Sequence, residues 1–472
     1  MPVSSNRTRN FEILIAIYTL ACFATLFLNN ALILILFEFI LTMYFVFRCN
    51  KNTLIYFIFA TVLQNFTLVV LSRNMSGTET SLAIFIKELA VYLCAMLFIV
   101  QQINNSKFKN IQDIIFVFFM SYAFLISFSI AAVPMSVRIT SLRQFVIPFF
   151  CFYFGCSIKL KNKEDCKIDK ILVFVSVIVC ILGLVIYVVG NENFWINIGY
   201  RDYIYNKLGS LKNYSIANFY TWDFGIKLKR FVSIFADPLA CSHFLAMAFI
   251  LLFYKYPHKY LLVKMLIALC MILCLSKAHL VIIFTTVFLH FYTRTKQQSI
   301  KIFYKVFLVI GFFSAFIGLT LYTNNLKENT AIGNHFSSFL AGLRDITLLG
   351  HGLGSSGYNA KLAGLTSDAS GTSESLAATL MFQMGIIGVI AFYAFIAVII
   401  SMCAKKYLKT KNKSIYACLV LMFSFCIESL VSASSLSMLG TGLYFVFTGL
   451  YIGTGKCANS ESIFELSSTQ GV

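Results

Sequence analysis

Charged residues are scarce in this sequence. Asp, Glu, Lys and Arg together make up 12% of its 472 residues, whereas hydrophobic residues make up 59%. A soluble domain carries about 25% charged residues, so the composition excludes a soluble fold and predicts an integral membrane protein with many spans. Acidic residues number 19 against 38 basic ones, and the formal net charge is +19. The basic residues form short clusters between apolar runs and no basic domain or stripe, so no nucleic-acid partner is predicted.

The sequence also lacks a recognisable metal-binding motif. Its 14 cysteines include no Cys-x-x-Cys pair and no Cys/His cluster at zinc spacing, and most of them fall inside apolar runs. We therefore expect free thiols packed among helices, with no metal and no cofactor. A removable signal peptide is not predicted either, because the apolar run after Arg9 ends at Asn29 without a small-residue cleavage site.

Long apolar runs fill most of the chain. A helix needs about 20 mostly apolar residues to cross a bilayer, and this rule predicts an all-α polytopic integral membrane protein with about 14 transmembrane helices. The candidate spans are residues 11–28, 31–47, 53–71, 82–101, 112–132, 144–158, 171–190, 232–254, 260–276, 278–292, 302–322, 375–402, 415–431 and 437–454.

The distribution of Lys and Arg predicts the orientation. Short cytoplasmic loops of membrane proteins are rich in these residues, and alternate connections of this chain carry them. The basic clusters lie at residues 48–51, 107–109, 159–170, 255–264, 294–301 and 405–413. Intervening connections, such as residues 72–81 and 431–437, are nearly uncharged. We therefore expect both termini in the cytoplasm and two large loops outside it.

This topology divides the chain into six parts. They are residues 1–189 with seven spans, the first large loop at 190–231, spans eight to eleven at 232–322, the second large loop at 323–373, three spans at 374–455, and a cytoplasmic tail at 456–472. Since both large loops face outward, the working surface is expected on the outer face of the membrane, away from ATP and nucleotide-activated substrates.

The first large loop combines aromatic residues with cations. It contains both tryptophans, Trp195 and Trp222, and it ends in the cation pair Lys229 and Arg230. Flat aromatic faces suit sugar rings, and clustered cations suit phosphate or pyrophosphate. Trp and Tyr also form an interfacial belt in any membrane protein, so both interpretations stay open at this point.

Other cations on the expected outer face oppose the charge rule. Arg138 and Arg143 lie in the connection between spans five and six, and Lys277 lies with His279 in a tight connection. An anionic ligand would explain these cations, and tolerated surface charges would explain them equally. Within span four, Lys87 is expected to pair with its neighbour Glu88.

Three residues are candidates for acid or base chemistry. Asp237, followed by Pro238, falls several residues inside an apolar run, where an ionisable side chain should face a partner or a wet cavity, or make a helix-packing contact. His351 lies in the glycine-rich segment 349–357, whose backbone N–H groups can turn toward an anion or a sugar oxygen. Glu374 precedes a long apolar run, where the alternative is an ordinary acid at a helix N-terminus.

Four segments follow one another in an informative order. They are Arg230 to Leu239 (RFVSIFADPL), the Ser276-Lys277 pair, Arg344 leading into the glycine-rich segment, and Glu374-Ser-Leu followed by residues 382–388. In these segments the chain resembles the O-antigen polymerase and O-antigen ligase superfamily of bacterial envelope glycosyltransferases. The resemblance covers about residues 225–400 by motif and the whole chain by span layout.

The resemblance implies a GT-C-like, metal-independent transferase in the bacterial inner membrane, with its active face periplasmic. Its substrates would be undecaprenyl-pyrophosphate-linked oligosaccharide repeat units, and its partners the lipid bilayer and the flippase and chain-length regulator of the same pathway. By position, Arg230 and Arg344 would bind the pyrophosphate with support from Lys277. The other outer cations, Arg138, Arg143 and Lys229, are candidates for the same anion.

The resemblance leaves the general base open between Glu374, Asp237 and His351. Ligases of this superfamily carry a histidine near the start of the span after the second loop, where this chain reads Thr-Ser-Glu-Ser-Leu at residues 372–376. The missing histidine favours a polymerase over a ligase. A lipid-linked oligosaccharide flippase is the alternative from another class, although flippases have two related halves and no half repeat is visible here. A structural subunit of an assembly complex would not explain the outer cations.

Overall fold

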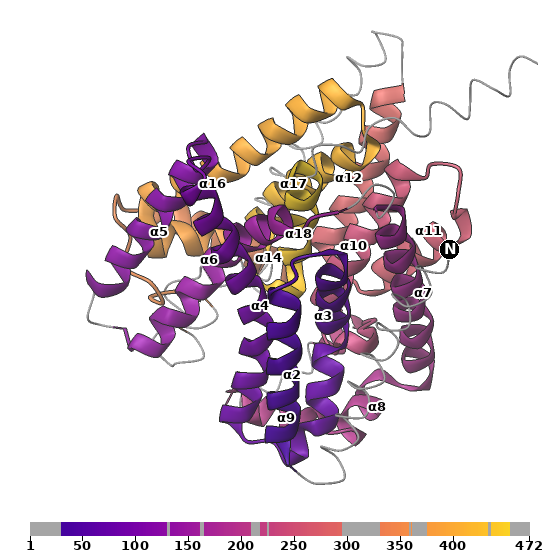
Figure 1. The fold of residues 1–472 in the computed structure, drawn as a ribbon. Coiled ribbons are helices and arrows are strands. Elements are labelled where there is room, and N and C mark those ends of the chain that lie inside the picture. Colours follow the sequence, from indigo (N-terminus) through magenta and orange to yellow (C-terminus); the bar gives the residue numbers. More distant parts are fainter. Residues whose placement is uncertain are drawn as a thin grey trace, which may run out of the picture.

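The computed structural model shows a protein built almost entirely of helices (Figure 1). It describes residues 30–129, 133–160, 165–208, 218–223, 226–294, 331–357, 360, 375–432 and 436–453. The predicted spans at 11–28 and 302–322, both termini and the candidate base Glu374 lie outside the described residues.

Helices occupy the other predicted spans. They are α2 (Ala31–Val46), α3 (Lys51–Leu71), α4 (Gly77–Asn104), α5 (Ile111–Ser129), α6 (Met135–Ser157), α7 (Asp165–Val189), α10 (Pro238–Lys255), α11 (Leu261–Leu273), α12 (Lys277–Arg294), α16 (Leu376–Thr410), α17 (Lys413–Val431) and α18 (Leu443–Gly453). Within the described ranges, 8 helices are long and apolar enough to cross a membrane, and shorter apolar helices accompany them. The prediction of a multi-pass helical membrane protein is confirmed, whereas the number of fourteen spans stays a prediction.

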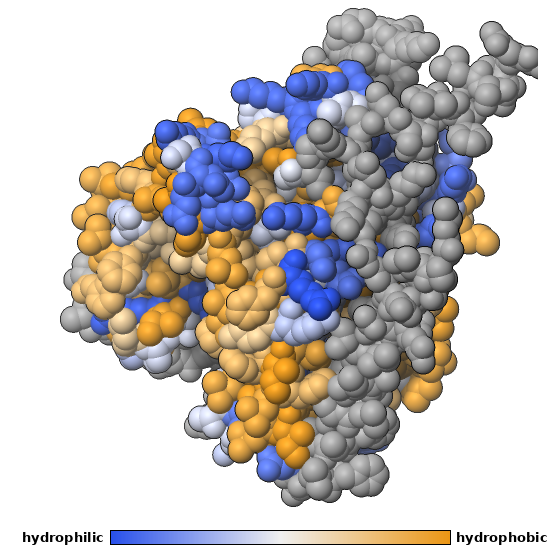
Figure 2. Space-filling view, in the orientation of Figure 1, coloured by the Kyte–Doolittle hydropathy of each residue, from blue (hydrophilic) through white to orange (hydrophobic). Residues whose placement is uncertain are grey.

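The surface of the bundle carries the apolar residues expected of a lipid-facing protein. Helix α5 alone exposes Phe118, Phe124, Leu125 and Phe128. Figure 2 shows such apolar residues spread over this flank of the molecule, with hydrophilic residues gathered in patches. Since these large side chains are exposed in the described part of the bundle, lipid is the solvent that suits them.

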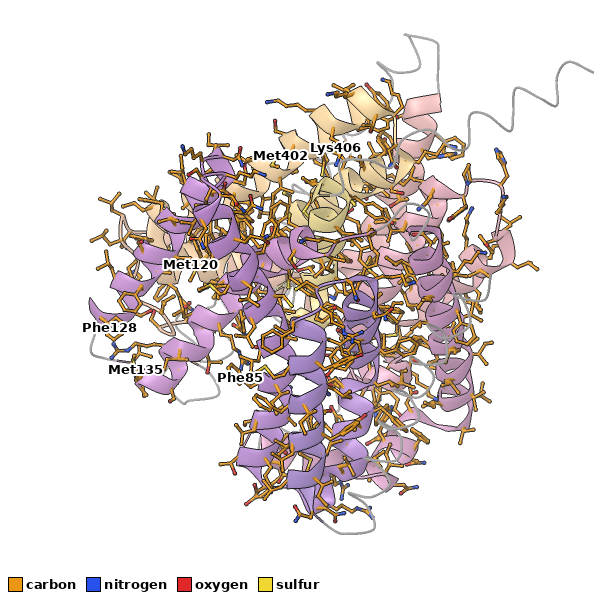
Figure 3. All side chains as sticks on the ribbon, in the orientation of Figure 1. Phe85, Met120, Phe128, Met135, Met402 and Lys406 are labelled. Carbon is orange, nitrogen blue, oxygen red and sulfur yellow. The ribbon has the colours of Figure 1, made fainter. Side chains whose placement is uncertain are left out.

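Helices α6 and α16 extend well beyond their predicted spans, because hydropathy does not mark where a helix ends. Helix α6 starts at Met135, directly after Pro134, so the prediction that Arg138 and Arg143 lie in a connection is wrong. Helix α16 continues to Thr410. On this extension, Lys406, labelled in Figure 3, donates hydrogen bonds from Nζ to the carbonyl oxygens of residues 451 and 452 at the end of α18, at 2.9 and 2.7 Å.

The first large loop folds into short elements at one end of the bundle, which we call the loop end (Figure 1). These elements are α8 (Asn191–Asn197), α9 (Tyr200–Leu208) and an antiparallel hairpin of β1 (Tyr220–Asp223) and β2 (Ile226–Lys229). Asn206 on α9 donates a hydrogen bond of 2.8 Å to the carbonyl of Ser72 in the α3–α4 connection. At the opposite end, the backbone N–H of Lys159 donates to the carbonyl of Cys49 at 3.2 Å. Connections expected on the same side of the membrane therefore meet.

Trp195 does not form part of an exposed sugar-binding platform. Its side chain is fully buried, and its ring lies 6.0 Å from that of Phe66 on α3 and 6.4 Å from that of Tyr200, measured between centroids. The aromatic residues of this loop that lie around Trp195 therefore hold the loop on the bundle. Trp222 belongs to β1, and its side chain lies outside the described part of the structure.

The interior holds two ion pairs that correct the expected pairing of Lys87 with Glu88. Lys87 Nζ lies 3.3 Å from Glu38 Oε1 of α2, and both side chains are buried. Glu88 faces the other way, and its Oε2 lies 3.3 Å from Nε of Arg143 on α6. Neighbouring residues of a helix point about 100° apart, so each of the two finds its partner on a different helix.

Candidate functional site

Arg230 is fixed where the chain passes from the hairpin into the bundle. Its backbone N–H donates to the carbonyl of Phe219 at 2.8 Å, and its Nε donates to the carbonyl of Cys274 at 3.1 Å. The next residue, Phe231, donates its N–H to the carbonyl of Leu273 at 2.9 Å. Arg230 therefore contacts the α11–α12 connection at Cys274, which is two residues before Ser276 and three before Lys277. Two of the predicted pyrophosphate-binding segments meet here.

Lys277 and Lys229 flank this point. Lys277 is the first residue of α12, and its side chain lies outside the described part of the structure. Lys229 Nζ contacts the carbonyl oxygen of Tyr187 at the end of α7 and lies 4.7 Å from the centre of its ring. Lys229 thus joins the hairpin to α7.

Asp237 begins a helix and does not lie inside one, which corrects the sequence-based prediction. Its Oδ1 accepts hydrogen bonds from the N–H groups of Leu239 and Ala240 at 2.8 and 3.3 Å, and Pro238 is the first residue of α10. An aspartate N-cap followed by proline satisfies N–H groups that no earlier turn can reach. The side chain serves the fold at this position.

The glycine-rich segment 349–357 contacts a break in α16 rather than presenting its N–H groups outward. The N–H groups of His351 and Gly352 donate to the carbonyls of Phe382 and Gln383 at 2.8 and 3.0 Å. The break lies at Gly385, whose φ of 63° only glycine adopts readily. Because these N–H groups are already used inside the protein, the predicted anion cradle is not formed by them.

Gln383 holds this segment in place. Its side chain is buried; Oε1 accepts a hydrogen bond from the N–H of Gly354 at 2.8 Å, and Nε2 donates to the carbonyl of Ser356 at 2.7 Å. We expect Gln383→Leu to destabilise the contact by about 1–3 kcal/mol, because both backbone groups lose their partner. Limited proteolysis should then cleave the segment faster than in wild type. Gln101→Leu, on the exposed end of α4, is the control, and equal cleavage of both variants would contradict the role of Gln383.

Arg344 and His351 lie together around Asp345 at the end of α14 (Ala331–Arg344). Nε and Nη2 of Arg344 pair with the two carboxylate oxygens of Asp345 at 3.0 and 3.3 Å. This hydrogen bonding, with the positive charge, lowers the pKa of Asp345 below its ordinary value. His351 Nε2 lies 3.1 Å from the carbonyl oxygen of Asp345. The side chain of Arg344 is 74% exposed, so a ligand can reach its guanidinium group.

The other two arginines of the predicted set make contacts within the helix bundle. Nη1 of Arg138 donates to the carbonyl of Ser127 at 2.9 Å, and its Nε donates to the carbonyl of Val133, so Arg138 closes the α5–α6 turn. Arg143 is paired with Glu88 of α4. The glycine-rich segment packs beside them, since a Cβ built on Gly354 would lie 3.0 Å from the side chain of Val137.

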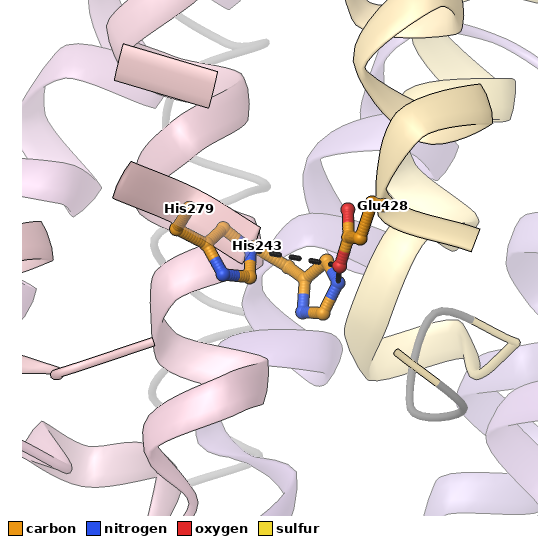
Figure 4. A group of neighbouring side chains, drawn as sticks. All are labelled: His243, His279 and Glu428. Atoms are coloured by element: carbon orange, nitrogen blue, oxygen red, sulfur yellow. Dashed lines mark ion pairs between the residues drawn. The ribbon is translucent and has the colours of Figure 1, made fainter. Parts of the chain in front are cut away.

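A cluster of three buried ionisable side chains lies between α10, α12 and α17 (Figure 4). His243 is on the second turn of α10, His279 on the first turn of α12, and Glu428 on the last turn of α17. All three side chains are fully buried. Nε2 of His243 contacts Oε1 of Glu428, and Nε2 of His279 lies 3.9 Å from the same oxygen.

The opposite nitrogen of each imidazole is anchored. Nδ1 of His243 lies 2.6 Å from the carbonyl oxygen of Leu239, one turn earlier on α10. Nδ1 of His279 lies 3.0 Å from Oγ of Ser242 and 2.6 Å from Oγ of Ser276. Ser276 belongs to the connection that Arg230 binds, so the cluster and the Arg230 region share one short stretch of chain.

His243 and Glu428 are candidate functional residues that the sequence-based prediction missed. The signal that marks them is an ionisable side chain inside an apolar run, the same signal that selected Asp237. His279 was predicted to lie with Lys277 in an outer connection, whereas it is a buried residue of α12. Helix α17 packs against both α12, which begins near Arg230, and α14, which ends at Arg344.

The fold defines the class of this protein as a multi-pass helical membrane protein, and its candidate site combines Arg230 and Arg344 with a buried His/Glu cluster. No protein-family model matches the chain, and the search of curated proteins gives no match either.

Proposed function

We propose that the chain is an O-antigen or surface-polysaccharide polymerase, an enzyme of the glycosyltransferase class. It would transfer a growing glycan from its undecaprenyl pyrophosphate carrier onto a new lipid-linked repeat unit at the outer face of the inner membrane. The observation that carries the proposal is the hydrogen bond of Arg230 to Cys274, two residues before Ser276, at the point where the first large loop enters the helix bundle. A polyprenyl carrier lies in the bilayer, and its pyrophosphate lies at the bilayer surface. Cations where a loop enters the helix bundle are therefore suited to bind the pyrophosphate.

The exposed guanidinium of Arg344 supports the same proposal. It lies at the end of α14, which packs against α16 and α17, and its planar fork matches the oxygens of a phosphate group. The pair with Asp345 is exposed and therefore weak, so a dianionic ligand can compete with that carboxylate. Arg230 and Arg344 are the two leading pyrophosphate ligands of the proposal.

The proposed reaction needs no cofactor. A hydroxyl of the incoming repeat unit attacks the anomeric carbon of the growing chain, and its proton passes to a base. The bond from the anomeric carbon to the pyrophosphate oxygen breaks, and polyprenyl pyrophosphate leaves with the electron pair. Cations aimed at this leaving group stabilise the charge that develops in the transition state. Of the candidate bases, His351 is exposed, and Asp237 uses one carboxylate oxygen as a helix cap.

The test is polysaccharide display in a strain that lacks this chain. Complementation with wild type should restore a ladder of polymer lengths, and Arg230→Ala or Arg344→Ala should leave a single repeat unit on the lipid core. Arg73→Ala is the matched control, since Arg73 is an exposed arginine at the loop end that pairs with Asp202 at 3.6 Å. With purified protein and lipid-linked repeat units, each of the two variants should lose about 100-fold or more in polymerisation rate.

The same gel separates the competing functions. Loss of a ligase would leave no repeat units on the core while polymer accumulates on its carrier, and loss of a flippase would trap repeat units inside the cell. A full ladder from both alanine variants would overturn the assignment of Arg230 and Arg344. Arg230→Lys should also stay well below wild type, because a lysine offers a point charge where the guanidinium offers a fork.

A further inference from the structure

We propose that His243, His279 and Glu428 bind one divalent transition metal ion of the zinc class, which joins α10, α12 and α17. No step of the proposed transferase reaction requires a metal at this cluster, so the proposal stands independently of the proposed function. It adds a metal to a chain whose sequence shows no metal-binding motif.

The first argument is the geometry of the donor atoms. One ligand atom from each of the three side chains lies within 4.8 Å of the other two. The imidazole rings are nearly perpendicular, at 87°, with centroids 4.3 Å apart. Zinc bonds imidazole nitrogen at about 2.0–2.1 Å and carboxylate oxygen at about 2.0–2.2 Å, so the ligand atoms of a tetrahedral site lie about 3.4 Å apart. Nε2 of His279 lies 3.9 Å from Oε1 of Glu428, close to that separation, whereas Nε2 of His243 contacts the same oxygen, so a bound ion requires a small rotation of the Glu428 side chain.

The second argument is the fixation of the rings. In metal sites, the ring nitrogen that does not bind the metal makes a hydrogen bond that sets the tautomer and the ring orientation. Here Nδ1 of His243 is held by the carbonyl of Leu239, and Nδ1 of His279 is held by Ser242 and Ser276. Both Nε2 atoms are thereby directed at the carboxylate of Glu428 (Figure 4).

The third argument is the set of buried polar atoms that the protein itself leaves without a hydrogen bond. In the described part of the chain, Nε2 of His279 and Oε2 of Glu428 belong to this set, while Nε2 of His243 and Oε1 of Glu428 contact each other. Uncompensated polar atoms are rare inside proteins, and an ion or a water is the usual explanation. Coordination to one metal ion would give the imidazole nitrogens and the carboxylate oxygens a partner together.

The fourth argument is charge. A buried carboxylate among apolar helices is costly unless it is paired or coordinates a metal. Two neutral imidazoles and one carboxylate carry one negative charge, which a divalent cation compensates. Tyr444 of α18 adds one more oxygen: its hydroxyl is buried without a hydrogen bond, and its ring centroid lies 6.1 Å from that of His243. With Tyr444 as the fourth ligand the site would be closed, as structural zinc sites are.

The metal would fix α12 next to Arg230. His279 is only three residues after Ser276, and the α11–α12 connection that contains Ser276 receives the Nε hydrogen bond of Arg230. An ion that joins the start of α10, the start of α12 and the end of α17 would hold this connection in one position. The alternative is a plain ion pair of protonated His243 with Glu428, which requires no metal.

The experiment uses full-length protein in lipid nanodiscs, purified through a tag without histidine. After chelator treatment, Zn²⁺ or Co²⁺ is added. We expect one ion per chain and, with Co²⁺, visible absorption bands of a four-coordinate site with nitrogen ligands. Glu428→Gln and His279→Gln should each weaken Zn²⁺ binding by about 100-fold or more, since even the loss of a supporting hydrogen bond costs about 10–100-fold. His258→Ala, an exposed histidine of the α10–α11 connection, should bind like wild type.

Wild-type protein that holds no stoichiometric metal would overturn the proposal and favour the plain ion pair. Equal weakening by His258→Ala, or no weakening by Glu428→Gln and His279→Gln, would overturn it as well. If either glutamine variant fails to fold, X-ray absorption of the wild-type zinc complex decides, because the proposal requires two imidazole ligands and oxygen ligands without sulfur. All these readouts are independent of polysaccharide synthesis, so failure of the metal site and failure of the polymerase proposal are distinguishable.

Discussion

Lys87→Met is expected to destabilise the folded protein by about 3–5 kcal/mol. The lysine compensates Glu38 across the α2–α4 contact at 3.3 Å, and both side chains are buried. Removing the cation leaves a carboxylate among apolar helices, which is far more costly than losing an exposed ion pair. Equilibrium unfolding in mixed micelles of increasing SDS fraction measures the change. Lys107→Met, in the exposed α4–α5 connection, is the control and should shift the transition little.

The double variant Lys87→Met with Glu38→Leu tests whether the two side chains act as a pair. Replacing both members of a buried ion pair by apolar residues is often neutral or stabilising, so the double variant should regain most of the stability lost by either single variant. A double variant as unstable as the sum of the singles would show that the two side chains do not act as a pair.

Gly449→Ala is expected to cost on the order of 3 kcal/mol, because a single methyl group has no room at that position. A Cβ at Gly449 would lie 2.0 Å from the carbonyl oxygen of Phe152, and a Cβ at Gly155 would lie 2.1 Å from that of Val446. The backbones of α18 and α6 are thus in direct contact, with a glycine of each helix facing the backbone of the other. Small residues allow such close approach of membrane helices. The backbones of both helices would have to separate.

Gly453→Ala is the matched control on the same helix. Its Cβ would lie 3.2 Å from Cα of Cys156, so a shift of a few tenths of an ångström is enough. Unfolding in SDS should separate the two variants clearly. Equal stability of Gly449→Ala and Gly453→Ala would contradict the close α6–α18 contact.

Apolar runs are sufficient to predict most helices of the bundle. The predicted spans at 31–47 and 53–71 correspond to α2 and α3, because each run is long and polar caps interrupt the sequence between them. Asn50 caps α3, and Ser76 with Glu79 forms a capping box at the start of α4. Such signals are local and therefore visible in the sequence. Helix ends without a change of hydropathy, as on α16, are not.

The order of the motifs along the chain is enough to select Arg230 and the Ser276-Lys277 pair. It does not show that they meet, because the hydrogen bond from Arg230 to Cys274 joins residues of different elements. For the glycine-rich segment, the glycines predict an unusual backbone but not its use. The N–H groups donate to α16, and only the position of that helix decides this.

The sequence by itself determined a helical, multi-pass membrane protein, because hydrophobicity and helix length are properties of contiguous residues. The tertiary structure alone decided which charged side chains pair and which buried ionisable side chains lie together. Lys87 points to Glu38 and Glu88 to Arg143 because successive residues of a helix face different neighbours. His243, His279 and Glu428 come from three helices, and only the packing of α10, α12 and α17 places them within reach of one ion.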